Sequence, residues 1–240
     1  MTGSDFFGVH IFSLDSGLMN VTTEEDGATG EQFKMTAICL RATYAKRLTD
    51  RLRVGFTGKY IREDIHTAYM QSFAFDVGSN FNTGLFGFII GMSVSNLGPE
   101  VKFSGDGLKV ELAEEFQQNG TVQKITESFS LPMTFRLGLL NEIIGPNSEY
   151  FKNKNHRLII SMDGINPMDY VLYGTAGLEY SWKDIAYIRM GNRFGHDTAK
   201  WSVGGGFNMS NKTFTVGLDY AYVNYGMLDY THQFGLNFEF

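Results

Sequence analysis

The sequence predicts an all-β fold, a transmembrane antiparallel up-and-down β-barrel with about twelve strands. Three observations predict it: alternation of apolar with small or polar residues, alternating segments about 9 to 13 residues long, and an unusual composition. The 240 residues include 28 Gly, 21 Phe and 12 Tyr, and only 19% are charged. Average globular proteins contain about 7% Gly and about 25% charged residues. The chain is therefore rich in glycine and aromatic residues and poor in charge.

Twelve alternating segments are expected to be strands. In chain order they lie at 5–14, 35–47, 51–61, 67–79, 84–95, 130–141, 155–163, 170–181, 185–193, 199–209, 212–222 and 228–240. Strands of soluble proteins usually have about 5–6 residues, whereas a tilted membrane strand needs about 9–11. A soluble β-sandwich would also have more proline in its turns, but the chain has only 4 Pro. The lengths thus favour a membrane barrel over a sandwich.

The connections between these segments divide by length. Tight polar turns are expected at 48–50, 80–83, 182–184 and 210–211, all at the end of the barrel that holds the C-terminus. Longer connections at 15–34, 62–66, 96–129, 164–169, 194–198 and 223–227 fall at the opposite end. Outer-membrane barrels have short periplasmic turns and longer external loops, although the connection 142–154 is an exception here. We therefore expect a single outer-membrane barrel domain over residues 1–240.

Alternate residues of a strand point to opposite faces, so each strand divides into two sets. The uniformly apolar set, with aromatic residues at its ends, is expected to face lipid. The other set holds Gly, Ser, Thr and most of the charges, and is expected to face the lumen as a network of ion pairs. Its candidate residues are Arg41, Lys59, Asp76, Arg136, Arg157, Asp163, Glu179, Arg189, Asp219 and Glu239. Charges that only fill a narrow lumen are the simpler explanation, and a role in transport is the alternative.

Several other classes of protein fit the sequence poorly. The uncharged stretch 77–99 is long enough for a membrane helix, but Gly and Asn interrupt it. The net charge of −6 and the absence of a basic patch argue against nucleic acid as a partner. The five histidines stand apart from other ligand residues, so we expect no metal site and no cofactor. Continued alternation after Gly204-Gly205-Gly206 excludes a phosphate-binding loop there.

An outer-membrane lipase is the main enzymatic alternative. His232 lies in the apolar set of the last segment, where a lipase could use a serine and a histidine on the outer wall. No serine lies in a G-x-S-x-G setting, and an interfacial histidine beside Tyr230 explains the position equally well. We therefore expect the protein not to be an enzyme.

Several segments, in their order along the chain, resemble the PorV/PorQ family of outer-membrane proteins. They include the stretch 44–52, the stretch 75–78, the element 93–99 with Asn96, Gly98 and Pro99, and the terminal segment from His232. The terminal residues His232, Phe234, Leu236, Phe238 and Phe240 match a C-terminal barrel-insertion signal. The similarity extends from about residue 15 to the end.

The resemblance implies a barrel similar to the FadL transporters, with fourteen strands and an N-terminal plug. Since the sequence shows only about twelve strands, we expect the signal peptide, plug and first strands to be missing by truncation. The implied location is the bacterial outer membrane, with outer-membrane lipid and the barrel-assembly machinery as partners. The implied function is a non-enzymatic role in type IX protein secretion, with secreted cargo proteins and other secretion components as partners. Passive transport of hydrophobic compounds and a purely structural role are the alternatives.

Overall fold

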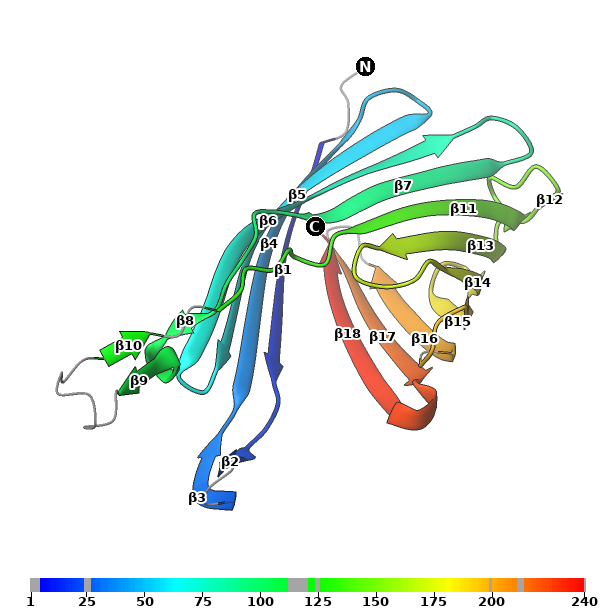
Figure 1. Ribbon diagram of the computed structural model, residues 1–240. Helices are drawn as coiled ribbons and strands as arrows, with labels where there is room; N and C mark the ends of the chain where they lie inside the picture. Colours follow the sequence, from blue (N-terminus) through cyan, green and yellow to red (C-terminus); the bar gives the residue numbers. More distant parts are fainter. Residues whose placement is uncertain are drawn as a thin grey trace.

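The computed structural model describes residues 5–23, 27–111, 121–123, 126–198, 200–210 and 214–239. Within them, one sheet of 14 strands, antiparallel along its main path, dominates the molecule (Figure 1). Twelve long strands form its continuous path. They are β1 (Asp5–Asp15), β4 (Met35–Arg47), β5 (Leu52–Ile65), β6 (Ala68–Asn82), β7 (Phe88–Leu97), β11 (Thr134–Gly145), β13 (His156–Pro167), β14 (Tyr173–Trp182), β15 (Ala186–Phe194), β16 (Trp201–Ser210), β17 (Thr215–Asn224) and β18 (Tyr230–Glu239).

Each long strand pairs with the next long strand of the chain, in the order β1-β4-β5-β6-β7-β11-β13-β14-β15-β16-β17-β18. This order is the expected up-and-down topology, and the strongly curved sheet has β1 and β18 as its edges (Figure 1). Within the described residues, no pairing joins these two edges. The predicted fold class, an incomplete antiparallel barrel of about twelve strands, is confirmed.

Shorter elements occupy the connections. β8 (Ser104–Gly105) pairs with β6, and β12 (Phe151–Lys152) pairs with β11. Two separate hairpins are formed by β2 (Met19–Thr23) with β3 (Gly27–Phe33), and by β9 (Lys109–Glu111) with β10 (Thr121–Gln123). The 3₁₀ helices are η1 (Asp106–Leu108) and η2 (Gly226–Leu228).

In the part of the chain that the structure describes, no helix is both long enough and apolar enough to cross a membrane.

We call the end of the sheet with the turns 48–51, 83–87 and 183–185 the short-turn end. The opposite end, with both hairpins, is the long-loop end. Several expectations about the connections were wrong. β13 continues to Pro167 into the predicted connection 164–169, and β6 continues to Asn82 through most of the predicted turn 80–83. The predicted loop 62–66 is mostly strand, because β5 and β6 pair up to Ile65 and Ala68 with only a two-residue turn between them. Residues 142–145 continue β11 through a bulge, so the long connection at the short-turn end shortens to 146–155.

The start of β11 was also predicted too early. The strand begins at Thr134 rather than at residue 130, because Leu131 is buried away from the sheet ladder and the Pro132 carbonyl binds a side chain. Proline also has no N–H to give to a ladder.

The register keeps the two sets of side chains on opposite faces across all twelve strands. The outer face carries large exposed apolar residues, which pair across neighbouring strands as Phe7 with Tyr44 and Phe56 with Phe75. Few side chains are fully buried, and four of these form one cluster, Met70, Ala74, Val101 and Leu131. An outward apolar surface with a small core is what a membrane barrel requires.

Candidate functional site

The inner face of the sheet is the candidate functional site. The register places all ten predicted lumenal residues, from Arg41 on β4 to Glu239 on β18, on this face. Only the backbone of Glu239 is described. Among the described residues, the ion pairs on this face form three separate groups, and the groups share no residue.

The first group is a buried ion pair on β5 and β6. Lys59 Nζ lies 2.7 Å from Asp76 Oδ1, with 6% of the Lys59 side chain exposed and 23% of the Asp76 side chain. The same ammonium donates a hydrogen bond to Asn96 Oδ1 at 2.8 Å, while the Asn96 backbone N–H donates to Asp76 Oδ1 at 2.8 Å. A buried pair needs such additional hydrogen bonds to offset its desolvation. The Asn96 of the predicted motif therefore completes the pair.

Asn96 lies in a bulge of β7. Leu97 and Val94 pair with Phe75 and Val77, so β7 has one extra residue here. The φ of Asn96 is 62°, in the left-handed region that asparagine tolerates better than most residues. The Asn96 Nδ2 also donates to the Pro132 carbonyl at 2.9 Å, which joins the residues before and after the long connection.

The second group joins four strands, β14, β15, β17 and β18. Arg189 on β15 lies directly opposite Glu179 on β14, and Nε lies 2.7 Å from Oε2. Its Nη1 also lies 2.5 Å from Asp219 Oδ1 on β17, across the intervening strand β16. Asn237 Nδ2 donates to the other Asp219 oxygen at 2.8 Å.

The glycine run on β16 makes this contact possible. Gly204 lies opposite Arg189, and Gly206 lies opposite Asp219. A Cβ on Gly206 would overlap the Asp219 carboxylate. Gly204 and Gly206 are therefore small residues of the inner face, while Gly205 between them lies on the outer face, and β16 continues through all three.

Arg157 forms the third group, with partners that were not expected from the sequence. Its Nε lies 3.8 Å from Glu142 at the β11 bulge, and its Nη1 lies 3.4 Å from Asp184 in the turn after β14. Both acidic residues lie outside the expected strands, so the alternation of apolar and polar residues could not predict that they would meet Arg157.

Three of the predicted lumenal residues, Arg41, Arg136 and Asp163, form no ion pair with the described residues. Arg41 donates to Cys39 Sγ at 3.4 Å, and Asp163 accepts a hydrogen bond from Thr175 at 3.1 Å. Arg136 makes no hydrogen bond or ion pair with the described residues. The reason is register: residues opposite Arg41 are His10 and Lys59, and residues opposite Arg136 are Ser93 and Ile165.

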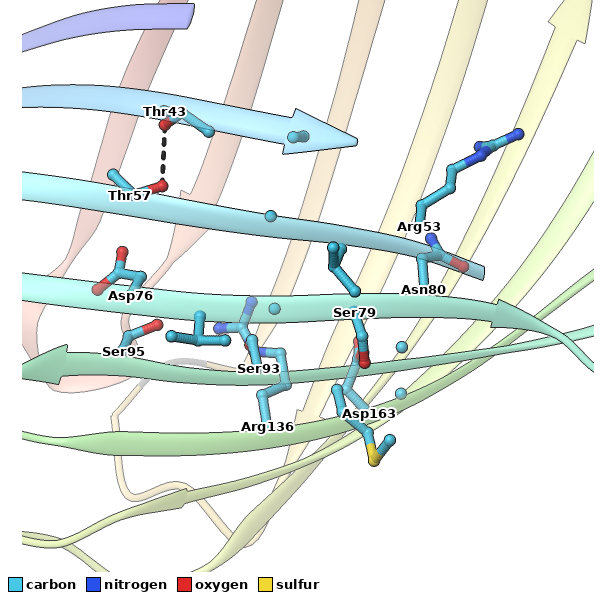
Figure 2. Close-up of a pocket in the computed structure, with 18 residues that line it drawn as sticks. Thr43, Arg53, Thr57, Asp76, Ser79, Asn80, Ser93, Ser95, Arg136 and Asp163 are labelled. Carbon is cyan, nitrogen blue, oxygen red and sulfur yellow. Dashed lines mark hydrogen bonds between the residues drawn. The ribbon is translucent and has the colours of Figure 1, made fainter. Parts of the chain in front are cut away.

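A groove of about 470 Å³ runs over this face from β4 to β13, toward the short-turn end (Figure 2). Asp76, Arg136 and Asp163 lie along it, and the Thr43 and Thr57 hydroxyls bond to each other at 2.9 Å in its wall. Its floor consists largely of small residues, including Gly55, Gly78, Gly91, Ser93, Ser95 and Gly138. A Cβ on Gly91 would meet no atom within 4 Å, so the groove has free space there.

The other motif residues follow β7. A Cβ on Gly98 would lie 2.7 Å from the Phe73 carbonyl and 2.9 Å from Leu131 Cδ1, so the chain can pass β6 this closely only with glycine. Pro99 lies two residues beyond the end of β7, where no ladder hydrogen bond is required of it.

The terminal residues of the predicted insertion signal lie on the outer face. Phe234, Leu236 and Phe238 are exposed there, while Phe240 lies outside the described residues. His232 Nδ1 and Tyr220 Oη are hydrogen-bonded at 2.7 Å, and His156 and Tyr180 repeat the arrangement at 2.6 Å at the opposite end. Aromatic side chains with polar tips at both ends of an apolar band are typical of membrane interfaces. Their role in insertion stays a prediction.

Two loops at the long-loop end are tied together. Tyr170 Oη donates to Asp197 Oδ2 at 2.6 Å, and this hydrogen bond raises the pKa of Tyr170. The His196 ring packs against Tyr170 and Tyr173.

Comparisons with known proteins match the fold. Two structures of the toluene transporter TodX from Pseudomonas putida are similar to this chain. One is 10% identical, covers 98% of this chain and 77% of TodX, and gives a TM-score of 0.54. The other is 11% identical, covers 91% and 73%, and gives 0.52. A FadL homologue from Pseudomonas aeruginosa is 12% identical, covers 90% and 66%, and gives 0.47.

No protein-family model and no curated protein sequence matches the chain. At these identities the structural likeness shows the fold alone. The expectation of a barrel similar to the FadL transporters is confirmed at that level.

Proposed function

We propose that this chain forms the barrel of an outer-membrane protein that lets small hydrophobic compounds cross the membrane passively. The observation that carries the proposal is the groove on the inner face of a fold shared with TodX, whose structures are described as those of a toluene transporter. The proposed orientation puts the short-turn end in the periplasm and the long-loop end outside the cell.

The residues that line the groove favour a transported compound that is only weakly polar. Its floor consists largely of small residues such as glycine and serine, which leave space and add no charge. The carboxylate of Asp76 is neutralised by Lys59, and that of Asp163 accepts a hydrogen bond from Thr175. Small-molecule binding sites are concave and mostly apolar, with a few polar groups that fix orientation. Arg53 and Arg136 are the charges in the groove wall that have no partner among the described residues.

A role in type IX secretion has less support. It rests on the resemblance of segments such as 93–99 to the PorV/PorQ family, and none of the similar structures named above is described as a secretion protein. The long connection 98–133 at the long-loop end would be the surface for a cargo protein under this hypothesis. We therefore make hydrophobic transport the main proposal.

Uptake by cells tests the proposal. The full-length protein is expressed in a host that lacks hydrocarbon transporters, and accumulation of radiolabelled toluene is measured. The proposal expects faster accumulation than with the empty vector. Equal rates, together with co-purification of a secreted protein that is lost on deleting residues 104–125, would favour secretion instead.

A further inference from the structure

The connection between β7 and β11 first continues beside β6, where β8 pairs with it, and its buried side chains pack on the inner face. We call residues 97–105 and 126–133 the inner segment. Its two parts lie side by side, through the bridge of Val101 with Phe129, the stacked rings of Phe103 and Phe129, and a hydrogen bond from Thr126 Oγ1 to the Phe103 carbonyl at 2.8 Å.

The inner segment covers the β5–β6 hairpin just beyond the groove. Val101 and Leu131 pack on Met70 and Ala74, which lie on the inner face of β6, with Ile61 of β5 beside them. The next inward-facing residue along β6 is Asp76, which lies in the groove wall. The segment therefore lies at the long-loop end of the groove.

Asn96 fastens this segment at the point where the groove begins. Its side chain accepts from Lys59 and donates to the Pro132 carbonyl, so one residue holds both ends of the inner segment against the wall. Asp76 and Ser95, its neighbours in space and in sequence, both line the groove.

The inner segment is held in place by fewer interactions than those that join the strands of the groove wall. The wall strands are joined by continuous ladders of up to fourteen residue pairs. The inner segment is held by the four-residue cluster, the Asn96 bonds, the single bridge, the short pairing of β8 with β6 and a hydrogen bond from the Met168 N–H to the Met133 carbonyl at 2.9 Å. Segments with few buried contacts and few backbone hydrogen bonds open locally at much lower free energy than the rest of a protein.

We propose that the inner segment is a lid over the long-loop end of the groove, and that the side-chain hydrogen bonds of Asn96 hold this lid closed. The lid moves when the Asn96 side chain releases Lys59 and Pro132, while the Lys59–Asp76 pair keeps the wall intact. The proposal rests on the proposed function in one respect, that the groove is the passage.

Labelling of a cysteine in the groove tests the lid. Ser93→Cys is made in a Cys39→Ser background, and a membrane-impermeant maleimide is added outside cells that lack general porins. Asn96→Gly removes the side-chain bonds but suits the left-handed backbone, so the fold is kept. The lid proposal expects this variant to be labelled at least about fivefold faster than the parent.

Two further variants make the test specific. Asn141→Ala removes a hydrogen bond to the Phe86 carbonyl at the short-turn end and is expected to leave the rate unchanged. A disulfide between Ala74→Cys and Val101→Cys, formed in the Asn96→Gly protein, is expected to restore slow labelling until it is reduced. Equal labelling of the parent and Asn96→Gly, or fast labelling with the disulfide in place, would overturn the proposal. Because labelling does not depend on the transported compound, a lid confirmed in this way without toluene uptake would refute only the proposed function.

Discussion

Arg189 on β15 and Asp219 on β17 form an ion pair across β16, the strand that lies between them. The contact needs an extended arginine and the absence of a side chain at Gly206, where a Cβ would overlap the Asp219 carboxylate. The small residues of β16 and the charged residues on either side of it therefore form one structural unit on the inner face, the ion pair across β16.

Replacing Arg189 with Gln is expected to lower the free energy of unfolding by about 1 kcal/mol, because two partly exposed ion pairs are lost. The Arg189 side chain is 44% exposed, so the loss should shrink at high salt. Arg136→Gln is the matched control, with no pair to lose and no expected change. The measurement is the urea midpoint of the folded, heat-modifiable band. Equal midpoints for both variants would contradict the ion-pair account.

Gly206→Ala is expected to destabilise the barrel by about 1–2 kcal/mol, because the new methyl group displaces the Asp219 carboxylate. Gly91→Ala, also on the inner face, adds its methyl group to empty space and should be neutral. The same urea titration compares them. A neutral Gly206→Ala would show that Asp219 can move without cost.

Asp76→Asn is expected to cost about 3 kcal/mol, because it leaves the buried Lys59 ammonium without a counter-charge. The double variant Lys59→Met/Asp76→Leu removes both charges and should be considerably more stable than the single variant. Chemical unfolding of both variants decides the matter. A double variant that is no more stable than Asp76→Asn would mean that the unpaired charge is not the cause.

Leu139 and Leu140 are neighbours on β11 with opposite orientations. Leu139 lies on the outer face, and Leu140 borders an inner cavity. Leu139→Arg should cost about 2–4 kcal/mol in lipid, whereas Leu140→Arg places its charge in the lumen and should cost much less. Unfolding from phospholipid vesicles measures both. The reverse order would mean that the two faces are assigned wrongly.

The period-two pattern predicted the twelve long strands, their order and their faces. It succeeded because each face of a membrane strand has a uniform environment, so parity alone decides which residues are apolar. It failed at strand ends. Charged residues such as Arg62 and Asp64 continue β5 beyond the apolar band as an ion pair of their own, and the pattern had indicated a loop there.

The pairing of the charges was less predictable than their positions. Parity placed Arg41, Arg136 and Arg189 on one face, but only the register determines which of them meets a carboxylate. The hydrogen bonds of Asn96 with Lys59 and Pro132 depend on a bulge in β7. A bulge shifts the register of a strand, but the amino-acid pattern does not show where it occurs. The resemblance had singled out Asn96 and Gly98, and the structure supplies their physical reason.

The central claim is that hydrophobic compounds move through the groove, and the most direct test fills it. Gly91→Phe places a ring in the free space of the groove, while Ile90→Phe puts the same ring on the outer face. Toluene uptake is measured in cells that express equal amounts of each folded variant. We expect uptake to fall to the empty-vector rate for Gly91→Phe and to stay at the parent rate for Ile90→Phe. Undiminished uptake through Gly91→Phe would contradict the claim.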